Sequence, residues 1–200
     1  MHPFIYLASQ SPRRAQLLGQ IGVKFELLPP RPDEDAEALE GHITGELPTA
    51  YVERVTGAKL QAARHRLRAS GLPAAPILCS DTTVALGRRI FGKPIDAADA
   101  RETLQRLSGK THRVITAVAV LAGTRTHIAT QTSHVSFGAI PTDTIERYIA
   151  SGEPFGKAGA YAIQSAIAAW VERIDGSYSS IMGLPLFETA HLLRQARVRF

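Results

Sequence analysis

The chain has 200 residues, of which 44% are hydrophobic and 20% are charged, and its net charge is +5. This ordinary composition suits a soluble globular protein with a sizeable core. No apolar run approaches the length of a membrane span, and the single cysteine, Cys79, excludes an intrachain disulfide. Because the chain also opens without a leader-like segment and has no run of five like charges, we expect a cytoplasmic protein whose positive charge is spread over solvated faces.

The segment SQSPRR, residues 9–14, follows a short apolar strand and opens a helix. Ser11 can cap this helix through its hydroxyl, and Pro12 suits the first helical position. Arg13 and Arg14 then lie in the first turn, where the helix dipole disfavours each cation by roughly 0.3–1 kcal/mol. A bound anion would reverse that sign, so the segment predicts a phosphate site, with two solvated arginines as the alternative.

Residues 29–48 are rich in Pro, Gly, Asp and Glu and predict a long loop. Its acidic cluster, residues 33–35, is typical of a solvated loop and would matter only if it faced the phosphate site, where a divalent cation needs oxygen ligands. A long helix is predicted over residues 49–70. Lys59 is the one lysine in that helix, and the residues alone favour a surface side chain there.

Residues 77–80 predict an apolar strand that ends in Asp81, Thr82 and Thr83. A carboxylate at the carboxyl end of a buried strand lies where α/β sheets bind ligands. The alternative role is a helix cap, but residues 84–91 have the pattern of a hairpin and not of a helix. Asp81 is therefore left without an obvious capping role.

The octapeptide GRRIFGKP, residues 87–94, nearly matches a Walker A loop. We reject that match because Pro94 replaces the hydroxyl residue that would hold Mg²⁺, and because the flanking pattern is a hairpin instead of a strand followed by a helix. Lys93 remains a candidate phosphate ligand.

The rest of the chain alternates helices with strands and predicts a mixed α/β fold, a twisted sheet with helices on both sides, in one domain over residues 1–200. The expected elements are a helix capped by Asp96, a hairpin of residues 111–121 and 126–137, a helix from residue 142, a strand over 168–174 and a helix over 186–195. Between them, residues 152–164 contain three glycines and a proline near their start, which predicts a close approach of the backbone.

Several catalytic motifs are missing from the sequence, including the nucleophile elbow, the dinucleotide loop and any zinc-ligand spacing. His112 is more consistent with a structural role than a catalytic one. The remaining basic groups, carboxylates and small-residue loops suit phosphate chemistry with a divalent metal and a water nucleophile.

The chain resembles the Maf-type nucleoside triphosphate pyrophosphatases nearly from end to end. The motifs that carry the resemblance are SxSPRR at 9–14, SDT at 80–82, GKP at 92–94, LSGKTH at 107–112, KAGAYxIQ at 157–164, GSY at 176–178 and GLPL at 183–186. Their order and spacing together are specific, although each motif alone is weak.

The resemblance implies a fold similar to that of the inosine triphosphate pyrophosphatases and cleavage of a nucleoside triphosphate between its α- and β-phosphates. It implies Asp81 as general base or metal ligand, with Mg²⁺ or Mn²⁺ also held by Glu34. For base choice, the resemblance implies Arg13, Thr82 and Gln164, and for phosphate binding it implies Lys59 and Lys93. The same motifs add four further candidates for substrate binding, namely Ser9, Ser11, Arg14 and Lys157.

The sequence is similar to the family branch that prefers dTTP and UTP. The Gln164 amide has both a donor and an acceptor, which can pair with the edge of uracil or thymine. Ala162 and Ser165 replace glycines that are usual around Gln164, and this departure bears on base preference more than on the reaction.

Two alternatives stay open, a 7-methyl-GTP pyrophosphatase of the same family and a non-catalytic nucleotide or nucleic-acid binder. Asp81 argues against the binder, because a carboxylate repels phosphate unless a metal intervenes. We expect a nucleoside triphosphate as substrate and neither a stable nucleic-acid complex nor a membrane partner. A homodimer is an open alternative to a monomer.

Overall fold

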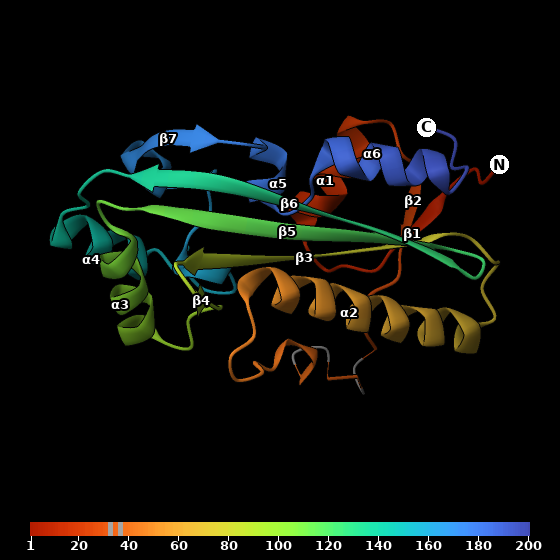
Figure 1. The fold of residues 1–200 in the computed structure, drawn as a ribbon, viewed down its shortest axis with the longest axis horizontal. Helices are drawn as coiled ribbons and strands as arrows, with labels where there is room; N and C mark the ends of the chain where they lie inside the picture. Colours follow the sequence, from red (N-terminus) through yellow and green to blue (C-terminus); the bar gives the residue numbers. More distant parts are fainter. Residues whose placement is uncertain (32–33, 36–37) are drawn as a thin grey trace.

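The computed structural model describes residues 1–31, 34–35 and 38–200, and within them the strands form one seven-stranded sheet of order β2-β1-β3-β5-β6-β7, with β4 paired to β3 (Figure 1). The strands are β1 (Ile5–Leu7), β2 (Phe25–Leu27), β3 (Ile77–Leu86), β4 (Arg89–Phe91), β5 (Thr111–Ala122), β6 (Arg125–Phe137) and β7 (Val171–Asp175). Strand β1 runs parallel to β2 and β3, and the other pairs are antiparallel. The predicted mixed α/β class is confirmed.

The helices cover both faces of the sheet, as predicted. They are α1 (Pro12–Gln20), α2 (Pro48–Ser70), α3 (Ala97–Leu107), α4 (Thr142–Ala150), α5 (Tyr178–Met182) and α6 (Leu186–Gln195), with 3-10 turns η1 (Ala38–Glu40), η2 (Ala158–Ala160) and η3 (Ala166–Trp170). Helix α2 runs along one face, while α1, α5 and α6 lie across the sheet from it (Figure 1). The two chain ends lie together, where His2 bridges Val198.

Side chains along β5 point alternately to the two faces of the sheet and pack in a different hydrophobic cluster on each face. Ile115 and Ala117 pack in a buried cluster with α2, whereas Val118 and Val120 belong to the larger core that includes Leu192 of α6. Successive strand residues point to opposite faces, so a strand buried on both sides reads as a nearly continuous apolar run. Thr116 therefore faces the side of α5 and α6.

Strand β3 has an open stretch along one edge. On that edge β1 pairs only with Ile77 and Leu78, and β4 pairs only from Val84 onward. Within the described residues, no strand pairs with positions 79–83 there, while the other edge pairs with β5 over the whole stretch. The gap gives a ligand access to side chains on both faces of the sheet.

Three local predictions were wrong. The strand does not end within residues 81–83 but continues without a break to Leu86, because β5 supplies a continuous partner. Ser11 occupies the N-cap position of α1 without a side-chain capping bond. The strand predicted from residue 168 begins only at Val171, since a 3-10 turn precedes it.

The close approach predicted for the glycine-rich segment is confirmed. Gly159 has φ +73°, and a Cβ atom placed there would lie 2.7 Å from Cγ2 of Val84. The hairpin at residues 84–91 and the cap of α3 are also confirmed, with Asp96 Oδ1 accepting from the Asp99 N–H at 2.8 Å.

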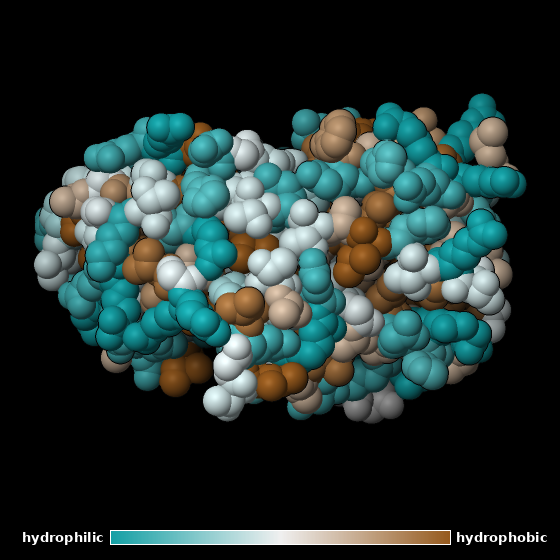
Figure 2. Space-filling view, in the orientation of Figure 1, coloured by the Kyte–Doolittle hydropathy of each residue, from teal (hydrophilic) through white to brown (hydrophobic). Residues whose placement is uncertain are grey.

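The surface in Figure 2 is mostly polar, with apolar residues in small groups between polar ones. In the parts of the chain that the structure describes, no helix combines the length and the apolar character that crossing a membrane requires.

Candidate active site

A cavity of about 650 Å³ opens at the unpaired edge of β3. Every site residue predicted from the sequence lines it except Gln164. The lining residues in that set are Ser9, Ser11, Arg13, Arg14, Glu34, Lys59, Asp81, Thr82, Lys93 and Lys157. Asp81 reaches the cavity from the α2 face and Thr82 from the opposite face, because neighbouring strand residues alternate.

One end of the cavity holds a chain of alternating charges. Lys59 Nζ donates to Asp81 Oδ1 at 2.5 Å and to Glu40 Oε1 at 2.7 Å. Lys93 Nζ lies 3.0 Å from Glu40 Oε2. The lysine of α2 is therefore turned inward and is not a dispersed surface charge, contrary to the reading of the helix pattern alone.

Glu40 is the carboxylate that sequence reasoning missed. Burial opposes its ionisation, but attraction and hydrogen bonds from Lys59 and Lys93 outweigh burial, so the pKa of Glu40 is lowered. The only signal in the sequence is that Glu40 belongs to the same acidic loop as the predicted Glu34.

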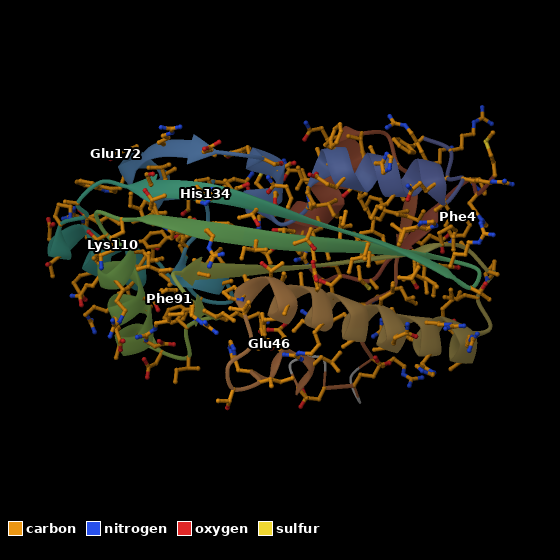
Figure 3. The ribbon with its side chains drawn as sticks, in the orientation of Figure 1. Phe4, Glu46, Phe91, Lys110, His134 and Glu172 are labelled. Carbon is orange, nitrogen blue, oxygen red and sulfur yellow. The ribbon has the colours of Figure 1, made fainter. Side chains whose placement is uncertain are left out.

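Helix α2 holds the loop that carries Glu40. Tyr51 Oη donates to the Glu40 carbonyl at 3.0 Å, and Arg54 donates to both carboxylate oxygens of Glu46, at 2.7 and 2.8 Å. Figure 3 shows Glu46 below the N-terminal end of α2. These contacts bind the loop along the helix and so place Glu40 beside Lys59.

Glu34 is bound to arginines instead of lying beside Asp81. Arg66 Nη2 lies 2.5 Å from Glu34 Oε2, and Arg31 Nε lies 3.1 Å from Glu34 Oε1. The hydrogen bonds from Arg66 lower the pKa of Glu34. Arg66 is itself buried and also donates to the Leu28 carbonyl at 2.8 Å, so this pair ties the loop to α2 and to the residue that directly follows β2.

The first turn of α1 is fixed to the chain near α5. Arg14 Nε donates to the Gly183 carbonyl at 2.8 Å, and Arg13 Nε donates to the Met182 carbonyl at 3.3 Å. Burial lowers the pKa of Arg14, although a guanidinium stays charged in proteins. The two cations at the start of the helix are thereby held at the cavity wall, as an anion site requires.

Ser9 is oriented by two donors. Its Oγ accepts from the Ser11 N–H at 3.2 Å and from Arg14 Nη1 at 3.1 Å. Because both lone pairs are used, Ser9 can bind a further group only by donating its hydroxyl proton, which suits an acceptor such as a phosphate oxygen.

The other end of the cavity is apolar. Its wall is formed by Val84, Val114, Phe155, Tyr161, Ile163, Ile181 and Met182. Behind the wall, Nε2 of buried His112 lies 2.7 Å from Tyr161 Oη. Burial lowers the pKa of His112 to about 4, so the imidazole is neutral at pH 7 and supports the wall. Phosphates suit the charged end of the cavity, and a flat base suits the apolar end.

Gln164 is exposed and follows Ile163, the last lining residue of its segment. It therefore lies at the rim of the apolar end, and its amide does not form part of the cavity wall.

The carboxylates suit a cation that is shared with a substrate. Within the described residues, no group of three or more His, Cys, Asp or Glu side chains is placed to hold a metal ion. Asp81 and Glu40 nevertheless share Lys59 as a common partner. Mg²⁺ commonly binds one or two carboxylates and completes its shell with water and phosphate oxygens, so this donor set fits such an ion.

Comparisons with known proteins agree with this geometry. The family model described as "Maf-like protein" matches residues 4–196. A dTTP/UTP pyrophosphatase of Burkholderia pseudomallei strain 1710b is 60% identical, and the match covers 100% of this chain and 96% of the relative. Proteins of the same name from Albidiferax ferrireducens and Polaromonas sp. are 60% and 59% identical, over 97% and 98% of this chain and 97% of each relative. The chain therefore belongs to the Maf-like protein family.

Proposed function

We propose that the domain of residues 1–200 hydrolyses nucleoside triphosphates, with dTTP and UTP preferred, to the monophosphate and pyrophosphate. The relatives named above are dTTP/UTP pyrophosphatases and match the whole chain. The observation that carries the proposal is one cavity with lysines and carboxylates at one end and an apolar wall at the other. Housecleaning of the nucleotide pool, in the cytoplasm, is the role that such an activity serves.

In the proposed reaction, water attacks the α-phosphorus in line with the departing pyrophosphate. Asp81 takes the proton of that water or holds the metal beside it, and these two roles remain alternatives. Lys59 and Lys93 neutralise charge that develops on the pyrophosphate, as preorganised cations do in other phosphoryl-group reactions. Binding of phosphate between them would replace carboxylate partners of both ammonium groups.

A divalent cation, Mg²⁺ or Mn²⁺, would supply charge neutralisation between the triphosphate and the two carboxylates. Asp81 and Glu40 are the residues that the geometry favours as its protein ligands. Glu34, the metal ligand that the resemblance implies, would bind the cation only if it first broke its ion pairs with Arg66 and Arg31.

Arg14, Ser9 and Ser11 would bind phosphate at the start of α1, and Lys157 would contribute a further charge from the cavity wall. Arg13 and Thr82 would contact the base, and Gln164 would act at the rim. A nucleoside triphosphate is thus the proposed partner, without a stable nucleic-acid complex, and a homodimer remains one possible assembly.

The test is a substrate panel with purified protein and Mg²⁺ or Mn²⁺. Pyrophosphate and monophosphate should form, with kcat/KM highest for dTTP and UTP. Release of orthophosphate and a diphosphate would contradict cleavage at the α-phosphate. Tight binding of every nucleotide without turnover would favour a binding protein, and 7-methyl-GTP as best substrate would favour the other branch of the family.

A further inference from the structure

We infer that Thr116, a buried residue of β5, orients the hydroxyl of Thr82 so that Thr82 can only accept a hydrogen bond from the bound base. Thr82 would then select bases that present an N–H at this point. The inference rests on the proposed function, because it takes the base to lie in the cavity beside Thr82.

Two hydrogen bonds set the direction of the protons. Thr116 Oγ1 donates to the backbone carbonyl of Ser180 at 2.8 Å, and a carbonyl can only accept. Thr82 Oγ1 lies 3.0 Å from Thr116 Oγ1. Since the single proton of Thr116 is committed to Ser180, the shared proton of the second bond must come from Thr82. A lone pair of Thr82 is then what remains for a ligand.

These two bonds form a relay from Thr82 through Thr116 to the Ser180 carbonyl. The Thr116 hydroxyl and the Ser180 carbonyl are both held in place. Thr116 has no exposed surface and lies on a strand paired on both sides, by β3 and β6. Ser180 belongs to α5, whose N-terminus is capped by Ser177, and its carbonyl also accepts from the Gly183 N–H at 2.8 Å. Reversal of the relay would take the Thr116 proton from the Ser180 carbonyl and leave that carbonyl only the Gly183 N–H, so the direction from Thr82 through Thr116 to Ser180 is preferred by one hydrogen bond.

The ligand side of the relay lies in the cavity. Thr82 lines the wall, and a Cβ atom placed on Gly183 would lie 3.7 Å from Thr82 Oγ1 and 3.6 Å from Arg14 Nε. Thr82 Oγ1 therefore lies close to the start of α1, within one cavity that also contains the phosphate-binding residues proposed above.

A hydroxyl that is oriented to accept distinguishes the pyrimidines by chemistry. Uracil and thymine present N3–H, which can donate to Thr82, whereas N3 of cytosine is an acceptor and would face a second lone pair. Sites with such a built-in polarity reject the wrong ligand because a buried polar group is left unpaired. The relay therefore selects UTP over CTP, which match closely in size.

The experiment compares Thr116→Val with Thr116→Ser. Valine keeps the volume but removes the relay, so the Thr82 hydroxyl can turn and donate to cytosine. We expect the ratio of kcat/KM for UTP to that for CTP to fall about tenfold in Thr116→Val and to stay within about twofold of wild type in Thr116→Ser. Thr56→Val is the matched control, because Thr56 is also fully buried but lies on α2 away from the cavity lining.

The outcomes separate this inference from the proposed function. An unchanged ratio in Thr116→Val, with UTP hydrolysis retained, would overturn the relay alone. Failure of the wild-type protein to release pyrophosphate from any nucleotide would overturn the proposed function instead. Circular dichroism checks the fold of each variant, and Thr116→Ala removes the same hydroxyl without a new contact if the valine variant does not fold.

Discussion

Lys59 Nζ donates to Asp81 Oδ1 across 2.5 Å and joins a residue of α2 to the middle of β3. The same ammonium donates to Glu40. One cation thus holds two carboxylates at the charged end of the cavity, which keeps them close together before any substrate binds. Removal of either carboxylate should therefore alter the reaction more than the fold.

Asp81→Asn should lower kcat by roughly 10²–10⁴-fold, the range for loss of a general base, with a nearly normal circular dichroism spectrum. Asparagine keeps the size of the side chain but removes its charge and basicity. Single-turnover kinetics with dTTP measure the effect, and Asp175→Asn at the exposed end of β7 is the control. Turnover near that of wild type would place the base elsewhere, with Glu40 as the next candidate.

Glu40→Gln and Glu34→Gln distinguish the two loop carboxylates. We expect Glu40→Gln to reduce kcat/KM by at least roughly tenfold and to raise the Mg²⁺ concentration needed for half-maximal rate, because Glu40 shares Lys59 with Asp81. Glu34→Gln should affect mainly stability, since Glu34 is bound to Arg66 and Arg31. A metal titration of both variants measures this, and the opposite order of effects would assign the metal to Glu34.

Arg66→Gln should destabilise the protein by roughly 1.5–3 kcal/mol, the range for hydrogen bonds to charged groups. Arg66 is buried and bonds both Glu34 and the Leu28 carbonyl, which glutamine cannot reproduce with a charge. Urea unfolding at pH 7 measures the loss. Arg68→Gln, on an exposed part of the same helix, is the control and should change stability by much less.

His112 should make stability depend on pH in a definite direction. Its pKa falls from 6.5 to about 4 through burial, so between these values the unfolded chain binds a proton that the folded protein does not. Stability is therefore full above about pH 6.5 and is lost as the pH falls toward 4, by up to roughly 3 kcal/mol from this group. Urea midpoints at pH 7 and pH 5 should differ less in His112→Gln than in wild type.

The control for His112 is His65→Gln, at an exposed position of α2, which should retain the pH dependence of wild type. An equal pH dependence in wild type and His112→Gln would mean that folding does not change the pKa of His112.

Gln164→Ala should reduce the preference for dTTP and UTP over CTP while pyrophosphate release persists. The reduction should be smaller than that from Thr82→Val, because Gln164 is exposed at the rim whereas Thr82 lines the cavity. The same panel of kcat/KM values measures both variants. A larger effect at Gln164 would mean that the segment around it closes over the base.

The sequence by itself determined the mixed α/β class, the hairpins and the cap at Asp96, because these depend on local periodicity and turn chemistry. It also determined which motifs meet at the site. A basic first helical turn identified Arg14, a carboxylate after an apolar run identified Asp81, and a Gly-Lys-Pro segment identified Lys93. All three residues line one cavity.

Only the tertiary structure decided which partners these residues have. Glu34 and Glu40 belong to one acidic loop and look equivalent in sequence, but Arg66 binds the first and Lys59 the second. In the relay, Thr82 and Thr116 are separated by 34 positions in the sequence, and Thr116 and Ser180 by 64. Such contacts are set by strand register and by the docking of α5, which side-chain periodicity along a single segment does not encode.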